Sequence, residues 1–197
     1  MRSPVEQFFN SLAPKWDEYA NDNLGRVATL FGRLGIQQGD RVLDLACGTG
    51  VVTGLLHEFS NAPVHGLDIA SNMIEIAKDK YEGQDYASFE VGDFLDYEGG
   101  RYDFIVIYNA YPHFVDRDAF ALALEKHLNP SGKFAIVHSL GRAQLSRHHE
   151  NLGPQISRDL LPANEEARFY QDRFDVLIAD EGDDFYLIEG CIKTPKR

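Results

Sequence analysis

Five short apolar runs, separated by turns and helix-like segments, occupy the chain between residues 41 and 139. Each run is rich in valine, isoleucine, leucine or phenylalanine, as strands covered on both faces are. Strands that alternate with helical segments form parallel sheets, because each parallel connection has to cross over the sheet. The pattern therefore predicts an α/β fold. The runs are RVLDLAC (41–47), PVHGLDI (63–69), ASFEVGD (87–93), YDFIVIYN (102–109) and KFAIVHS (133–139).

Two of the connecting segments carry helix signals. SNMIEIAKDKY begins with Ser71, a residue type that favours the N-cap position. Its apolar residues Met73, Ile76 and Ala77 fall on one helical face. DRDAFALALEKHL begins near Asp116 and ends before NPSG, whose proline and glycine do not continue a helix. We expect both segments to cover the sheet.

The two ends of the chain have different patterns. FDVLIADEGDDFYLIEGCIK (174–193) contains two apolar runs around an acidic turn, which predicts an antiparallel hairpin at one edge of the sheet. The polar segment before it predicts a helix that extends to about Leu161. The first forty residues predict two or three helices and no strand. The whole pattern indicates a Rossmann-like fold of three layers: a mostly parallel, seven-stranded sheet with helices on both faces. The N-terminal helices would form a cap.

Charge and composition disfavour several classes of protein. The formal net charge of −12 would repel a nucleic acid backbone. No apolar stretch reaches the roughly 18 residues that span a bilayer, and the N-terminus lacks the apolar core of a signal peptide. We therefore expect a cytoplasmic protein. Cys47 and Cys191 form no CxxC pair, which argues against a disulfide or a zinc site.

The segment VLDLACGTG (42–50) places Asp44 inside the first run and two glycines just after it. Such a strand-to-helix turn presents backbone N–H groups at the edge where α/β sheets bind ligands. The dinucleotide fingerprint G-x-G-x-x-G does not fit, because Thr53 stands where the third glycine would be. The Asp44 carboxylate would repel a pyrophosphate and attract a cation. The turn therefore favours a cationic nucleotide derivative without phosphates.

S-adenosylmethionine has this chemistry, with a sulfonium, an ammonium group and no phosphate. VLDLACGTG resembles the first motif of the Rossmann-like, class I S-adenosylmethionine-dependent methyltransferases, and the likeness continues through most of the chain. Ala46 stands where the family usually has a glycine, a small residue in place of a smaller one. The resemblance implies that this turn binds the methionine part of the cofactor through Asp44, Ala46, Cys47, Gly48 and Gly50.

Two further segments resemble motifs that bind the nucleoside in this family. Asp68 ends the second run, where the family has a carboxylate that accepts hydrogen bonds from the ribose hydroxyls. Ile69 and Met73 follow where the family packs the adenine. VGDF resembles the third motif, which implies that Asp93 contacts the adenine amino group and Phe94 its ring.

The segment YNAYPHF, after the fourth run, is similar to the family's segment at the same place. The likeness implies that Asn109, Ala110 and Tyr111 line the cofactor and that His113 faces the site of transfer. A phenol or an activated carbon would need a base, and His113 or Tyr111 could supply it, whereas an amine or a thiolate hardly needs one. His113 and Tyr111 are the candidate catalytic residues.

The opening FFNSLAPKWDEYAN resembles the N-terminal helix of the ubiquinone/menaquinone C-methyltransferases and similar small-molecule enzymes. In those relatives this helix caps the cofactor and shapes the substrate pocket. The likeness implies that Tyr19 neighbours the cofactor, with Trp16 and Phe8 as pocket walls. We expect one domain of 197 residues, formed by a helical cap (1–40), a cofactor-binding core (41–139) and a substrate-side helix with the terminal hairpin (140–197).

Simpler roles remain open for several of these residues. Asp44 or Asp68 could cap a helix, and Asp93 with Phe94 could be a loop acid beside a core aromatic. Cys47, at a helix N-terminus, could be a reactive thiol, although a packing role is favoured. Aromatic residues at helical spacing, as in the N-terminal segment, usually belong to the core.

The histidines also have alternative roles. His113 could be a general base or a histidine packed under its loop. Together with His138, His148 and His149 it could form a metal site, but the ligand spacing of such sites is absent and no metal is expected. The sequence does not assign a role to His138, His148 or His149.

These features predict a methyltransferase that uses S-adenosylmethionine, yields S-adenosylhomocysteine and acts on a small molecule by in-line displacement. Two other classes of function remain open, a non-catalytic S-adenosylmethionine-binding module and an NAD(P)-dependent oxidoreductase. A protein acceptor also remains open. The identity of the acceptor atom and the oligomeric state do not follow from the sequence.

Overall fold

The structure is a computed structural model that describes residues 3–19, 24–150 and 152–193. The chain divides into two compact units, residues 1–98 and 99–197. Within the described residues, seven strands belong to one sheet with the order β3-β2-β1-β4-β5-β7-β6. The sheet is mostly parallel with an antiparallel C-terminal pair, which confirms the predicted class of fold. The single domain with its three parts stays a prediction.

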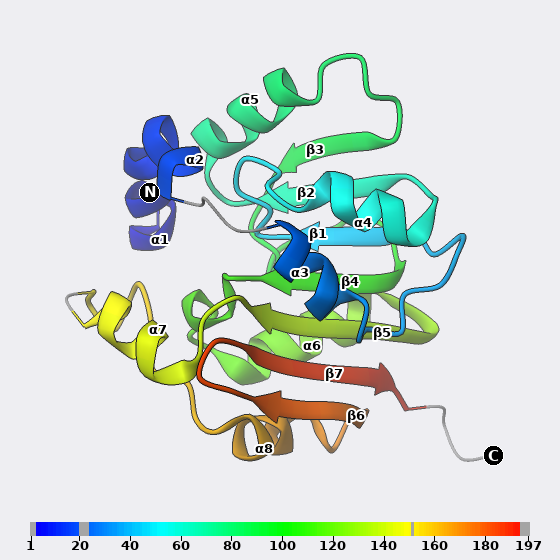
Figure 1. Cartoon of the computed structure of the whole chain (residues 1–197), viewed down its shortest axis with the longest axis vertical. Coiled ribbons are helices and arrows are strands. Elements are labelled where there is room, and N and C mark those ends of the chain that lie inside the picture. The colour runs from blue at the N-terminus through cyan, green and yellow to red at the C-terminus, as the bar shows by residue number, and fades with distance from the viewer. Residues whose placement is uncertain (1–2, 20–23, 151, 194–197) are drawn as a thin grey trace. The chain divides into compact units, whose positions relative to one another are not determined.

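The first unit contains the three parallel strands β1, β2 and β3 (Figure 1). Helix α4 packs on β1 and β2, and α5 packs on β2 and β3. Residues of β1 and β2 such as Leu43, Leu45 and Leu67 are fully buried, as the apolar runs predicted. The bounds are β1 (Val42–Leu45), α4 (Thr53–Ser60), β2 (Val64–Asp68), α5 (Ser71–Lys80) and β3 (Ala87–Val91).

The first unit also carries the N-terminal helices, which confirm the predicted helical segment. Ser3 caps α1 by accepting a hydrogen bond from the Glu6 N–H at 3.1 Å. Helix α1 and the following η1 both lie against α5, and the buried side chains of Ala13 in η1 and Met73 in α5 belong to one apolar cluster. The bounds are α1 (Pro4–Leu12), η1 (Ala13–Lys15), α2 (Trp16–Tyr19) and α3 (Leu24–Phe31).

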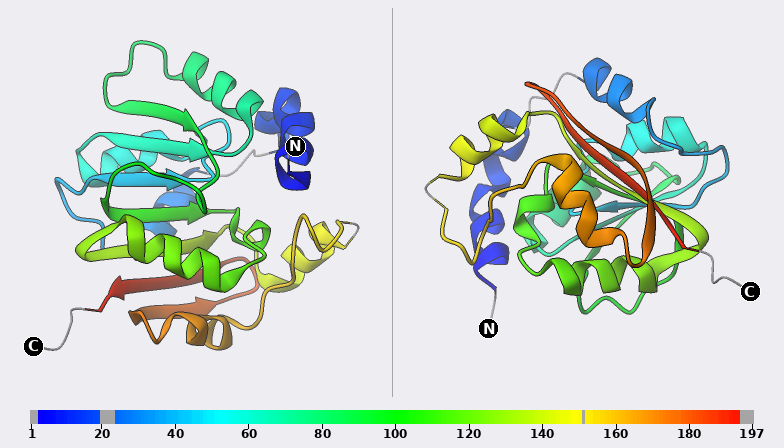
Figure 2. Two further views of the ribbon diagram at one scale, coloured as in Figure 1. Left: turned by 180° about the vertical axis from the view of Figure 1, so that it is seen from behind. Right: turned by 90° about the horizontal axis from the view of Figure 1, so that it is seen from below.

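In the second unit, β4 and β5 are parallel, and β7 and β6 add the antiparallel pair predicted as a hairpin. Helices α6 and α8 cover the same face of these strands (Figure 2). Helix α6 begins next to Asp116, as predicted, and Asp116 caps it by accepting a hydrogen bond from the Ala119 N–H at 2.9 Å. The bounds are β4 (Tyr102–Tyr108), η2 (Tyr111–His113), α6 (Arg117–His127), β5 (Leu128–His138), α7 (Arg142–His149), α8 (Ala163–Glu166), η3 (Ala167–Tyr170), β6 (Phe174–Glu181) and β7 (Tyr186–Ile192).

One predicted cap and two predicted boundaries are wrong. The N-cap position of α5 is Ala70 rather than Ser71, and no side chain caps this helix; the Asp68 carboxylate accepts the N–H of Ala70 itself. The helix predicted to reach Leu161 ends at His149, and residues 152–162 contain no helix, in keeping with their glycine and two prolines. Strand β5 begins at Leu128, and NPSG lies inside it, where the pairing with β4 shifts register.

Among the residues that the structure describes, no helix has the length and apolar character needed to cross a membrane.

Candidate functional site

The turn between β1 and α4 is built from residues in the left-handed backbone region. Ala46, Gly48 and Gly50 have φ values of 56°, 55° and 75°. A Cβ atom on Gly50 would lie 2.9 Å from the Tyr81 ring, and one on Gly48 would lie 3.1 Å from Nε1 of Trp16. Glycine suits these two positions because they combine a left-handed backbone with close neighbours. The turn therefore brings its backbone N–H groups to the carboxyl end of β1.

Asp44 is a buried carboxylate in β1, with 1% of its surface exposed. The Thr53 hydroxyl donates a 2.6 Å hydrogen bond to its Oδ2. Burial raises the pKa of Asp44 to about 7, and the nearby Asp68 contributes to the rise. A cation placed beside Asp44 would stabilise the ionised form, so the site suits a positively charged ligand.

Asp68 ends β2 and holds the turn in place. Its Oδ2 accepts the Gly48 N–H and its Oδ1 accepts the Ala70 N–H, both at 2.8 Å. Burial raises the pKa of Asp68 to about 6, although these two hydrogen bonds favour the charged form. A carboxylate has about four lone-pair sites, so two accepted bonds leave capacity for hydroxyl donors. Asp68 therefore both orders the turn and can bind a ribose.

Cys47 and Met73 lie in apolar clusters. Cys47 packs with Ile74, Ala77 and Phe89, and burial raises the pKa of its thiol well above the usual value. This environment favours a packing role over a reactive thiol. Met73 lies 1% exposed against Ala13, with Trp16 packed beside this cluster. The predicted contacts of Cys47, Ile69 and Met73 with a cofactor stay predictions.

Asp93 and Phe94 follow β3. Asp93 accepts the Leu95 N–H at 3.0 Å and is half-buried, while Phe94 is 2% exposed. An aspartate that accepts a nearby backbone N–H in a turn, next to a buried phenylalanine, also occurs in proteins that bind no nucleotide, because aspartate commonly forms such hydrogen bonds in turns. Their roles toward adenine stay predictions.

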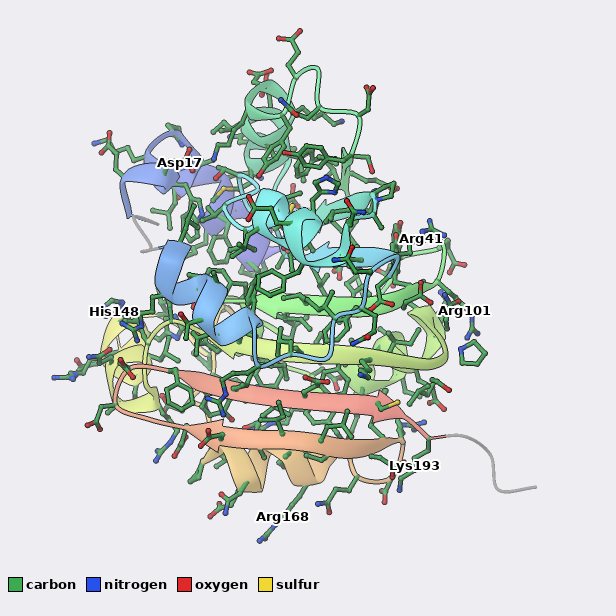
Figure 3. All side chains as sticks on the ribbon, turned by 45° about the vertical axis from the view of Figure 1, so that its right-hand side comes forward. Asp17, Arg41, Arg101, His148, Arg168 and Lys193 are labelled. Atoms are coloured by element: carbon green, nitrogen blue, oxygen red, sulfur yellow. The ribbon has the colours of Figure 1, made fainter. Side chains whose placement is uncertain are left out.

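Three residues that the sequence did not single out join α2 to the turn. Asp17 lies on α2 (Figure 3). It accepts a hydrogen bond from the Thr49 hydroxyl, and its carboxylate lies 2.8 Å from the Lys80 Nζ. Lys80 Nζ also donates to the Thr49 hydroxyl at 3.2 Å. Nothing in the local pattern shows this link, because the partners are 32 and 63 positions apart. Tyr19 ends α2, but its side chain lies outside the described residues.

In the second unit, Asn109 joins the ends of β4 and β5. It has a φ of 53°. Its side chain donates to the Ser139 hydroxyl at 3.0 Å and accepts the Ser139 N–H at 2.9 Å. Ala110, directly after it, is 8% exposed. These contacts fix where η2 begins, and the predicted contacts of Asn109 and Ala110 with a cofactor stay predictions.

The Tyr111 hydroxyl belongs to a buried hydrogen-bond network. It donates to Glu166 at 2.7 Å and accepts from the Tyr170 hydroxyl at 2.6 Å. Arg117 and Arg158 pair with the same Glu166 carboxylate, at 2.6 Å and 3.0 Å. Burial raises the pKa of Tyr111 above its ordinary value. This environment favours a structural role for Tyr111, and its catalytic role stays an untested prediction.

His113, in η2, is held by the segment after α7. Its Nδ1 lies 2.9 Å from the Ile156 carbonyl oxygen, so Nδ1 carries the proton and the lone pair of the neutral ring is on Nε2. Burial lowers the pKa of His113 to about 4. The ring is therefore neutral at pH 7, the form that a general base requires. The catalytic role of His113 stays a prediction.

The described ranges hold no group of three or more histidine, cysteine, aspartate or glutamate residues with the geometry of a metal site.

In Rossmann-like α/β proteins, nucleotides bind at the carboxyl edge of the parallel strands. Here that edge carries a left-handed turn after β1 and two buried carboxylates on the adjacent strands β1 and β2. The chain belongs to a family described as a methyltransferase domain, which matches residues 36–161.

Two curated relatives illustrate this family. The malonyl-[acyl-carrier protein] O-methyltransferase of Priestia megaterium is 32% identical over 150 residues, covering 74% of this chain and 54% of the relative. The demethylmenaquinone methyltransferase of Lactobacillus johnsonii is 29% identical over 147 residues, covering 68% of this chain and 60% of the relative. The chain thus spans little more than half the length of these relatives.

A solved structure has the same fold. The magnesium protoporphyrin IX methyltransferase of Synechocystis with bound SAH is 18% identical and superposes with a TM-score of 0.71. The match covers 96% of this chain and 98% of that one. The likeness confirms the predicted Rossmann-like fold.

Proposed function

We propose that this protein is a methyltransferase that binds S-adenosylmethionine and transfers its methyl group to a small molecule. The observation that carries the proposal is the pair of buried carboxylates, Asp44 and Asp68, beside a turn of left-handed residues. Burial disfavours both negative charges, so a cationic ligand offsets a cost that an anionic dinucleotide would increase. Membership of the methyltransferase family supports the same cofactor.

The residues of the first unit fit this cofactor by charge and by shape. Asp44 would face its positively charged methionine part, and Asp68 would accept the ribose hydroxyls while keeping the turn in register. Gly48 and Gly50 let the turn pack closely against Trp16 and Tyr81, which holds its backbone in the left-handed shape. When bound, the sulfonium supplies an activated methyl group whose leaving group is neutral.

The protein would contribute mainly position. Orienting an acceptor in line with the C–S bond, about 3 to 3.5 Å from the methyl carbon, can supply several kcal/mol because the two reactants no longer have to meet by diffusion. The acceptor atom forms the new bond to carbon while the electron pair of the C–S bond stays on sulfur. Where the acceptor carries a proton, neutral His113 would take it at Nε2.

A small-molecule acceptor is supported by the relatives, whose names include a demethylmenaquinone methyltransferase. A nucleic acid is disfavoured by the net charge of −12. The name of the malonyl-[acyl-carrier protein] methyltransferase keeps an acceptor carried by a protein within the proposal.

The test is a transfer assay with a labelled methyl donor and a metabolite panel that includes free and carrier-bound acids, quinol precursors and amines. Label in a product, with release of S-adenosylhomocysteine, supports the proposal. Binding of the donor without transfer to any acceptor would indicate a non-catalytic binding module. Binding of NAD(P) in place of the donor would indicate an oxidoreductase.

A further inference from the structure

The last residue of β5, His138, is a buried side chain without a hydrogen bond. It is 0% exposed, and neither ring nitrogen has a hydrogen-bond partner in the part of the chain that the structure describes. Leaving a buried polar group unsatisfied costs about 1–3 kcal/mol, so such groups call for a partner outside the polypeptide. The methyl-transfer proposal above gives this residue no role.

Arg158 supplies a positive charge near His138. Burial lowers its pKa to about 3, and the nearby His113, His149 and Arg158 lower it further. The His113 and His149 rings are 5.2 Å apart, and His149 Nδ1 lies 3.1 Å from the Ser157 hydroxyl. At pH 7 the three imidazoles are therefore neutral, and Arg158 is the nearby cation that acts on the His138 ring.

Arg158 is held rigidly beside this cluster. Its backbone N–H donates to the Pro112 carbonyl at 3.0 Å, and its Nε donates to the Phe114 carbonyl at 3.2 Å. The guanidinium lies 4.5 Å from the centre of the Tyr111 ring. Its Nη2 lies 3.0 Å from the Glu166 carboxylate, but without the alignment of a hydrogen bond. The buried Nη2 thus retains donor capacity.

Charge also favours an anion here. The carboxylate of Glu166 pairs with two guanidinium groups, those of Arg117 and Arg158. These three side chains together therefore carry one net positive charge. Near His138 the structure thus offers an N–H of a neutral imidazole that has no hydrogen bond among the described residues, and the buried guanidinium Nη2 of Arg158, which is ion-paired with Glu166 at 3.0 Å but makes no hydrogen bond. Two such donors match the two oxygens of a carboxylate.

We propose that His138 and Arg158 recognise a carboxylate on the methyl acceptor, so that the substrate is a small carboxylic acid. This inference rests on the proposed methyltransferase activity. The rings of His113 and His149, which act on the buried His138 ring, are themselves partly exposed. Binding would give the His138 ring and Arg158 Nη2 a hydrogen-bond acceptor that the described residues do not supply.

The test uses the full chain saturated with S-adenosylhomocysteine and carrying ¹³C-labelled histidine. The probes are benzoate and hexanoate, each compared with its uncharged amide, benzamide or hexanamide. We expect the acids to shift the His138 ring resonance and the amides to leave it in place. Loss of a charge-assisted hydrogen bond weakens binding about 10- to 100-fold, so the His138→Leu variant should bind the acids that much less tightly.

His138→Leu also separates recognition from a structural role. Leucine brings no polar atom into the buried position, so the variant should melt at or above the temperature of the wild type. His148→Asn, at an exposed position of α7, is the matched control and should bind the acids as the wild type does (Figure 3). Arg158→Lys keeps the charge but not the planar donor pair, and should also weaken binding.

Several outcomes would overturn the inference. It fails if the amides bind as well as the acids, or if neither shifts the His138 resonance while S-adenosylhomocysteine binds, which would leave buried water as the partner of the ring. It also fails if His138→Leu binds the acids normally. Failure of S-adenosylhomocysteine itself to bind would instead overturn the proposed function.

Discussion

The Gly48 N–H donates a 2.8 Å hydrogen bond to Oδ2 of Asp68, across 20 positions of the chain. The bond joins the turn after β1 to the end of β2. Because the second oxygen accepts the Ala70 N–H, both oxygens of Asp68 receive backbone donors. In Asp68→Asn an amide NH₂ group replaces one of these two oxygens, and this group donates hydrogen bonds rather than accepting them. We expect S-adenosylmethionine affinity to fall about 10- to 100-fold, measured by calorimetry.

Asp96→Asn is the control for this change, because Asp96 is an exposed residue a few positions beyond β3. It should leave the affinity unchanged. If Asp68→Asn bound the cofactor as tightly as the control, Asp68 would have no part in the site.

The raised pKa of Asp44 makes stability depend on pH. The carboxyl binds its proton more tightly in the folded chain, where its pKa is about 7, than in the unfolded chain, where it has the usual pKa of 3.8. Its ionisation therefore destabilises the ligand-free fold progressively as pH rises between these values. We expect Asp44→Asn to be more stable than the wild type at about pH 8, by a margin that shrinks toward about pH 4. Thermal unfolding without ligand, measured across this range, checks the sign.

S-adenosylmethionine should reduce the stability advantage that Asp44→Asn has without ligand. A cation favours the ionised Asp44 carboxylate, so the ligand should raise the melting temperature of the wild type more than that of Asp44→Asn. An equal rise in the two proteins would contradict a contact between Asp44 and the charged part of the cofactor.

Ala46 has a left-handed φ of 56°, a conformation that costs a residue with a Cβ about 1–2 kcal/mol. Ala46→Gly removes this strain but makes the unfolded chain more flexible, so we expect a net gain of up to about 1 kcal/mol. Ala62→Gly, at a position without a positive φ, should lose stability instead. Thermal melts compare the two variants, and a larger loss in Ala46→Gly than in Ala62→Gly would contradict the expectation.

The role of His113 is tested by kinetics. For an acceptor that loses a proton, His113→Ala should lower turnover about 10²- to 10⁴-fold, with cofactor affinity nearly intact. His148→Ala, at an exposed position of α7, should leave both quantities unchanged. Unchanged turnover in His113→Ala with such an acceptor would remove this residue from the mechanism.

The strands and the capped helix α6 followed from local signals, because buried runs and an N-cap aspartate act within a few residues. The N-cap of α5 did not, because Ala70 has no capping side chain and its N–H is bound by Asp68, whose carboxylate also accepts the Gly48 N–H. The helix after β5 was predicted too long, because the polar composition of residues 150–161 outweighed the helix-breaking residues at 153 and 154.

The acids of the candidate site could be named from VLDLACGTG and GLDI, since a carboxylate inside or at the end of an apolar run is unusual. The link of Asp17 to Thr49 and Lys80 could not, because it depends on how α2 packs. That no described residue hydrogen-bonds the His138 ring was equally hidden, because it depends on how distant parts of the chain pack.

The most direct test of the central claim is a calorimetric titration of the full chain with S-adenosylmethionine and, separately, with NAD⁺ and NADP⁺. Two buried carboxylates beside the turn should favour the cation and oppose the diphosphates. We expect saturable one-to-one binding of S-adenosylmethionine that weakens in Asp44→Asn, and no binding of either dinucleotide. Tight binding of NAD⁺ or NADP⁺, with none of S-adenosylmethionine, would contradict the account.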